Sequence, residues 1–308
     1  MGKKINHAHD FDKCLDISDR WDIFFTERAS YPIAKSFNKH NVHPNTVTIL
    51  GGLLGVAGAV CFAFNKVWIS IIGIILEILY VIFDSADGQV ARMSKKGSLF
   101  GRCLDGFIDG VVYFAIYIAL SIRLMGEVIP FTTIKWGWYI WLISVPVGVY
   151  FHASQSRMAD YYRNVHMYLS KNERGNELTT SEWVREQMNK SNKFIEKFQI
   201  KSYYSYTKSQ EKTTPEFQEL FRLIKENNDV IPDDVSTYFR SESNKICRLA
   251  NALVFNVRSY TLFILLLCKL HVWIFPFNLF VLEPIKIFLN VRYKKICKKC
   301  IEMMPNHK

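Results

Sequence analysis

Cysteine is scarce in this sequence, and its spacing forms no disulfide framework. Seven cysteines occur among 308 residues. Cys297 and Cys300 form a C-x-x-C pair, but no second pair accompanies it, so the signal for zinc or redox chemistry is weak. We therefore expect free thiols, several of them facing a reducing cytoplasm, and we place Cys297 and Cys300 in a solvated tail.

The first 46 residues lack the short apolar core of a cleavable signal peptide, since they are polar and mixed in charge. We expect the N-terminus to stay in the cytoplasm. His7, His9 and Asp10 cluster there, but a cluster of this kind near a terminus is more often accidental than a metal site. The sequence also lacks internal repeats.

The charge distribution lacks the basic domain that a nucleic-acid-binding protein needs. The net charge is +11, yet the polar stretch 156–246 carries 15 basic and 14 acidic residues. The excess of positive charge therefore lies beside the apolar segments, where lysine and arginine set membrane topology and contact anionic lipid. We expect membrane lipids, and no nucleic acid, as partners.

Apolar runs, in contrast, are long and frequent. Six of them approach the roughly 20 residues that a helix needs to cross a bilayer: 47–64, 68–83, 107–124, 136–151, 250–267 and 272–289. Ahead of them, the stretch 17–37 mixes aromatic and basic residues in the manner of an interfacial helix. The sequence predicts an all-α, polytopic membrane protein with about six transmembrane helices, an N-terminal interfacial helix and a cytoplasmic helical insert.

Lysine and arginine also predict the orientation. Seven lie in residues 1–46, four in 92–102 and six in 291–308, whereas the opposite loops hold only Lys66, Lys135 and Lys269. Both termini and the 92–102 loop are therefore expected in the cytoplasm. The predicted organisation is a cytoplasmic N-terminus with the interfacial helix (1–46), spans one to four (47–155), the polar insert (156–246), spans five and six (247–290) and a basic cytoplasmic tail (291–308).

Four carboxylates stand at the ends of two predicted spans. Asp84 and Asp87 follow the second span, and Asp105 and Asp109 introduce the third. Separations of three and four residues place each pair on one helical face. Ionisable groups at membrane depth are costly and usually functional, so we expect the two faces to meet.

Converging carboxylates repel one another, and a divalent cation would remove the repulsion while binding a diphosphate. All-oxygen ligands favour Mg²⁺ or Mn²⁺. Separately, each element has a plain alternative: Asp84 to Gly88 as a helix-ending turn, or Asp105 in an ion pair with Arg102 or Lys96. Both pairs together are harder to explain structurally, and the spacing excludes an EF-hand.

The stretch from Asp84 to Asp109 matches the pattern D-x2-D-G-x2-A-R-x8-G-x3-D-x3-D at every specified position. Because of this match, the stretch resembles the signature of the CDP-alcohol phosphotransferase (CDP-alcohol phosphatidyltransferase) family. Pro44, Asn45 and Thr48 are similar to a P-N-x-x-T pattern of many members. The likeness covers roughly residues 17–151, and the long insert is a departure, since many members have a short loop there.

The resemblance implies a role for each matching residue. Asp84, Asp87 and Asp105 would be ligands of Mg²⁺ or Mn²⁺, and Asp109 would complete the metal site and act as general base. The implied CDP pocket consists of Gly88, Ala91, Arg92 and Gly101, with Asn45 and Thr48 nearby. The implied reaction moves a substituted phosphate from a CDP-linked lipid donor to a small polar alcohol and releases CMP. A homodimer is usual in such families.

The motif leaves the acceptor alcohol open. A phosphorylated acceptor would need cations, for which Arg157, Arg248 and Arg258 are candidates, although interfacial arginines also contact lipid phosphates. We favour CDP-diacylglycerol as donor. The alternatives are a CDP-choline or CDP-ethanolamine head-group transfer to a lipid alcohol, a transporter, and a catalytically silent scaffold that acts through the insert.

Overall fold

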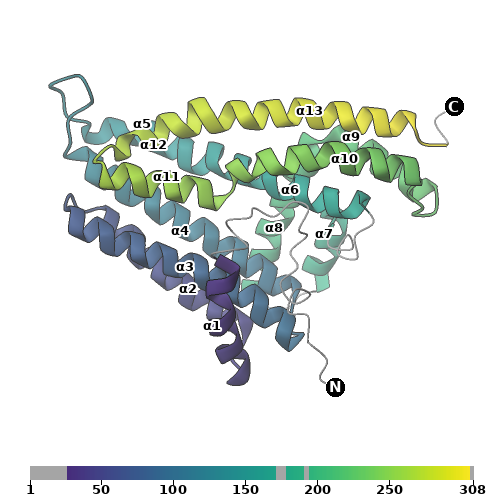
Figure 1. Ribbon diagram of the computed structural model, residues 1–308, viewed down its shortest axis with the longest axis horizontal. Coiled ribbons are helices and arrows are strands. Elements are labelled where there is room, and N and C mark those ends of the chain that lie inside the picture. The colour runs from purple at the N-terminus through teal and green to yellow at the C-terminus, as the bar shows by residue number, and fades with distance from the viewer. Residues whose placement is uncertain (1–25, 171–177, 191–193, 306–308) are drawn as a thin grey trace, which may run out of the picture. The chain divides into compact units, whose positions relative to one another are not determined.

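The computed structural model describes residues 26–170, 178–190 and 194–305 (Figure 1). In these residues helices dominate, no strand forms, and Val128 and Lys135 make an isolated bridge. The predicted all-α class is confirmed. His7, His9, Asp10 and the first part of the predicted interfacial helix lie outside the described residues. The chain divides into two compact units, Met1–Ile116 and Tyr117–Lys308.

The first unit holds α1 (Arg28–Lys39), α2 (Pro44–Phe62), α3 (Val67–Ser94) and the first part of α4 (Leu99–Met125). α2 begins at Pro44, a residue suited to a first helical turn because it has no N–H to leave unpaired. α3 ends before Lys95, whose φ of 55° is left-handed. The predicted second span therefore continues as one helix through Asp84 and Asp87.

Glycines on α2 bring the neighbouring helices close. A Cβ added at Gly58 would lie 2.9 Å from the carbonyl oxygen of Gly73 on α3. One added at Gly52 would lie 2.5 Å from a methyl carbon of Ile108 on α4. α2 runs beside α3 (Figure 1), and this close packing fixes the helices that carry the carboxylates.

α1 also packs on α3, directly behind the motif. Ala34 of α1 is fully buried in a cluster with Ala86 and Val90 of α3. Gln89 donates a hydrogen bond of 2.9 Å to Ser30 Oγ. The described part of the predicted interfacial helix thus contacts the helix that carries Asp84 and Asp87.

The second unit contains the end of α4 and the remaining helices. They are η2 (Gly137–Ile140), α5 (Trp141–Val145), η3 (Pro146–His152), α6 (Ala153–Leu169), α7 (Ser181–Lys190), α8 (Phe194–Thr213), α9 (Pro215–Glu226), α10 (Asp233–Ala250), η5 (Asn251–Leu253), α11 (Phe255–Leu267), η6 (His271–Trp273), α12 (Ile274–Phe277), η7 (Asn278–Leu282) and α13 (Glu283–Glu302). η3 and η7 are π-helical. α10 runs beside α13 (Figure 1).

Within the described residues, five helical segments are long and apolar enough to cross a membrane. They are Pro44–Phe62, Val67–Ser94, Leu99–Met125, Asp233–Leu267 and His271–Glu302. The predicted fourth span, 136–151, is helical but is not among them. Five spans thus have support from length and composition, and the count of six stays a prediction.

The described residues of the insert form α7, α8, α9 and most of α6 and α10. Thr180 Oγ1 accepts a hydrogen bond of 3.3 Å from Trp183 N at the start of α7, and α9 begins at Pro215. Whether this part lies in the cytoplasm stays a prediction.

The prediction of a solvated tail for Cys297 and Cys300 is wrong. α13 continues to Glu302, and both side chains are fully buried within it. Their spacing of three residues places them on one helical face, together with Tyr293 and Ile296. Since α13 packs against α9 and α10, this face is covered and the thiols are part of a helix–helix contact.

Candidate metal and nucleotide site

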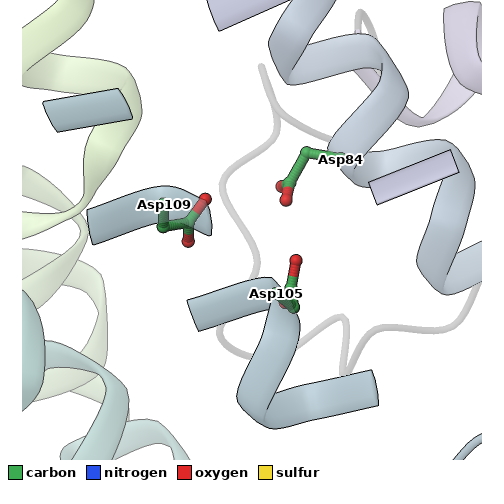
Figure 2. A group of neighbouring side chains, drawn as sticks. All are labelled: Asp84, Asp105 and Asp109. Carbon is green, nitrogen blue, oxygen red and sulfur yellow. The ribbon is translucent and has the colours of Figure 1, made fainter. Parts of the chain in front are cut away.

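Three of the four predicted carboxylates meet between α3 and α4. One ligand atom from each of Asp84, Asp105 and Asp109 lies within 4.8 Å of the other two. Figure 2 shows Asp84 and Asp105 pointing toward one another. The separation of four residues brings Asp105 and Asp109 to the same face of α4, and all three belong to the first unit.

This arrangement fits a hard divalent cation. Oδ1 of Asp105 is buried and has no hydrogen-bond partner, and a buried acceptor without a partner is costly. Three converging carboxylates also repel one another unless a positive charge lies among them. Because carboxylate oxygens are the ligands that Mg²⁺ and Mn²⁺ prefer, these residues suit such an ion.

Asp87 is not a member of this group. Its Oδ2 accepts a hydrogen bond of 2.5 Å from Thr48 Oγ1, which connects α3 to α2. Thr48 was predicted to lie near the nucleotide, and in the structure its hydroxyl contacts Asp87. The role of Asp87 as a metal ligand stays a prediction.

The structure relates two pairs among the residues predicted for the CDP pocket. Asn45 is next to Gly101, where an added Cβ would be 3.2 Å from Asn45 Oδ1. A Cβ added at Gly88 would lie 3.5 Å from Nη1 of Arg92. Arg92 is exposed and Ala91 is partly buried. The nucleotide pocket itself stays a prediction.

Sequence reasoning missed Tyr80. Its hydroxyl donates a hydrogen bond to Asp109 Oδ1, and its side chain is only 2% exposed. The signal available in the sequence was its position four residues before Asp84, on the same helical face. Nothing in the sequence showed that this face meets Asp109.

The three arginines proposed for a phosphorylated acceptor differ from one another. Arg258 is buried and donates hydrogen bonds to Gln155, Ser156 and Asn278. Arg157 is partly buried and lies over the ring of Tyr206, 5.7 Å from its centroid. Arg248 is exposed. All three belong to the second unit, and their part in substrate binding stays a prediction.

Comparison with known proteins identifies the segment that contains the site. Residues 41–161 match the CDP-alcohol phosphatidyltransferase family. The phosphatidylinositol phosphate synthase of Mycobacterium bovis is 34% identical over 94 residues, 30% of this chain and 42% of that protein. The protein of the same name from Streptomyces avermitilis is 36% identical over 96 residues, 30% of this chain and 37% of that protein.

A third relative has a different name. The bifunctional IPC transferase and DIPP synthase of Aquifex aeolicus is 37% identical over 81 residues, 26% of this chain and 18% of that protein. The chain thus spans less than half the length of these curated relatives. No solved structure matches it. The similarity to the CDP-alcohol phosphatidyltransferase family thus lies in residues 41–161, which include all four predicted aspartates.

Proposed function

We propose that this protein transfers a substituted phosphate group from a CDP-linked lipid, CDP-diacylglycerol in the first instance, to a small polar alcohol and releases CMP. The observation that carries the proposal is the convergence of Asp84, Asp105 and Asp109 within the segment that matches the family. The apolar length of α3 and α4 supports a lipid substrate, because the carboxylates belong to helices suited to a membrane.

Asp84, Asp105 and Asp109 would hold Mg²⁺ or Mn²⁺, with Asp87 as a further predicted ligand. When bound, the ion supplies positive charge that neutralises the diphosphate and stabilises CMP as the leaving group. Arg92 would add a bidentate donor for phosphate oxygens, and the glycines at 88 and 101 would let the nucleotide approach the backbone.

Asp109 would act as the general base. It accepts the proton of the acceptor hydroxyl while the hydroxyl oxygen forms a bond to the β-phosphorus, and the bond between that phosphorus and the oxygen of CMP breaks. A base of this kind contributes about 10²–10⁴-fold to a rate. The two products are the new phosphodiester and CMP.

The names of the relatives guide the choice of acceptor. Two are called phosphatidylinositol phosphate synthase, so inositol phosphate is the first acceptor to test. Buried Arg258 supplies a cation of the kind that a phosphorylated acceptor would need, but its guanidinium is already engaged with protein groups. Glycerol phosphate, inositol and serine complete the set.

We further propose that both termini and the site face the cytoplasm, in accordance with the lysine and arginine bias. The overall arrangement is then a membrane protein with its reaction at the cytoplasmic surface, where water-soluble acceptors reach it. Labelling of single cysteines introduced at exposed Lys96 and Lys135 from each side of sealed vesicles tests this orientation. Labelling of both from the same side would contradict it.

The reaction is tested by measuring CMP release from purified protein with Mg²⁺ or Mn²⁺, CDP-diacylglycerol and each acceptor. Metal-dependent release with one acceptor would support the reaction and identify the substrate. Asp109→Asn should abolish turnover yet leave metal-dependent binding of the CDP-lipid. If no CMP is released with any of these acceptors, nor with CDP-choline or CDP-ethanolamine plus a lipid alcohol, the catalytically silent scaffold is favoured.

A further inference from the structure

Tyr80 lies in a tight slot between the helices of the first unit. It belongs to α3 and is 2% exposed. A Cβ added at Gly55 on α2 would lie 3.0 Å from Tyr80 Cγ and 2.8 Å from the methyl carbons of Val112 on α4. The absence of a side chain at Gly55 therefore makes room for the ring, and the packing around it restricts the direction of its hydroxyl.

That hydroxyl donates to Oδ1 of Asp109 on α4. Buried tyrosine hydroxyls usually have a partner, but here the partner is one of the three carboxylates that converge. A donor fixed in this way restricts rotation of the carboxylate.

The plain alternative is that Tyr80 only fills space. A phenylalanine would fill the same slot, since the two side chains differ by the hydroxyl. If filling space were the whole role, removal of the hydroxyl would change neither metal binding nor turnover. The hydroxyl is the group that contacts Asp109, and its effect is therefore separable from that of the ring.

We infer that Tyr80 is a positioning residue, which orients the Asp109 carboxylate for metal binding and for acceptance of the acceptor proton. This inference rests on the proposed function, in which Asp109 has both tasks. Partners of metal-binding carboxylates typically contribute about 10–100-fold to metal affinity or activity. A displacement of about 1 Å at a reacting group has a cost of similar size.

The test compares Tyr80→Phe with Tyr117→Phe. Tyr117 is also buried and belongs to α4, but its hydroxyl lies 3.3 Å from His152 Nδ1 and contacts no carboxylate of the group. Mn²⁺ affinity is measured by titration followed by electron paramagnetic resonance, kcat by CMP release, and folding by thermal unfolding in detergent. Y80F should lower Mn²⁺ affinity and kcat about tenfold or more, and Y117F should leave both within about twofold.

A double-mutant cycle with Asp109→Asn separates positioning from a structural effect. If Tyr80 acts through Asp109, Y80F should cause no further loss of Mn²⁺ affinity in the D109N background. The inference would be overturned if Y80F lowered Mn²⁺ affinity as much in the D109N background as in wild type. It would also be overturned if Y80F left Mn²⁺ affinity unchanged in wild type. Wild-type protein that binds Mn²⁺ but releases no CMP would refute the proposed reaction alone, because the Mn²⁺ cycle still decides the role of Tyr80.

Discussion

Thr48 and Asp87 are joined by a hydrogen bond of 2.5 Å that connects α2 to α3 one turn from Asp84. Both side chains are buried, at 7% and 8% exposure. Asp87 lies outside the group formed by the other three aspartates, and the bond to Thr48 holds its carboxylate against α2. Thr48 thus fixes the position of an aspartate that the sequence motif requires.

Replacement of Thr48 by valine keeps the shape of the side chain and removes the donor. A hydrogen bond to a charged group is worth about 1.5–3 kcal/mol, so kcat/KM for CMP release should fall about 10-fold to 100-fold. Thr48→Ser keeps the hydroxyl and should stay within about threefold of wild type. Equal activity of the valine and serine variants would show that the bond has no functional role.

Asp105→Asn should stabilise the protein when no metal is present. It removes one of three converging negative charges and so relieves their repulsion. In EDTA the variant should therefore unfold at a higher temperature than wild type. On addition of Mn²⁺ the order should reverse, since a ligand at 100 times its Kd stabilises wild type by about 2.7 kcal/mol.

The control for this change is Asp229→Asn, which alters an exposed ion pair with Lys225. It should leave unfolding in EDTA and the response to Mn²⁺ almost as in wild type, because exposed pairs contribute only about 0–1 kcal/mol. If D105N were less stable than wild type in EDTA, repulsion among the carboxylates would not be the dominant electrostatic term.

Gly58→Ala tests the close approach of α2 and α3. The new Cβ would meet the carbonyl oxygen of Gly73 at 2.9 Å and the backbone nitrogen of Glu77 at 3.2 Å. Backbone atoms have little room to move, so we expect a loss of about 1–3 kcal/mol in the free energy of unfolding. Gly110→Ala, a helical position with nothing within 4 Å, should instead stabilise by up to about 1 kcal/mol. Similar unfolding curves for the two variants would contradict this packing argument.

Spacing and membrane depth predicted that four carboxylates converge, and the structure brings three of them together. Separations of three and four residues place side chains on one helical face, and the cost of charge at membrane depth indicated that Asp84, Asp87, Asp105 and Asp109 have a common partner. The sequence did not reveal the bond between Tyr80 and Asp109. Helical spacing specifies which residues share a face of one helix, whereas this bond depends on the rotation of α3 relative to α4.

The wrong prediction for Cys297 and Cys300 has the same cause, because helical spacing does not specify which helices pack on a face. Their neighbours at 294, 295, 298 and 299 are lysines, which suggested a solvated segment. The helix turns the lysines away and buries the thiols against α9 and α10. The partner helices come from the insert, whose sequence shows helix starts but not the surface on which its helices pack.

Glu127 gives a prediction for the second unit. Its Oε1 is 3.2 Å from Arg123 Nε, and its Oε2 is 3.0 Å from His271 Nε2. Burial raises the pKa of Glu127, but His271 and Arg123 together lower it by more, so the pKa lies below its usual value. The carboxylate therefore stabilises the fold above the unfolded pKa of about 4.3. This contribution is lost as the pH falls through the lower pKa of the folded state.

Glu127→Gln removes the charge and should lower the free energy of unfolding at pH 7 by about 1–2 kcal/mol. The comparison is Glu219→Gln, which alters an exposed pair with Arg222 and should cost at most about 0.5 kcal/mol. Thermal unfolding in detergent at a series of pH values measures both. The deficit of E127Q should persist down to about pH 4.3 and shrink at lower pH, where wild type also loses the charge. A deficit that is constant through this range would mean that the charge of Glu127 is not its source, because an effect of shape alone does not titrate.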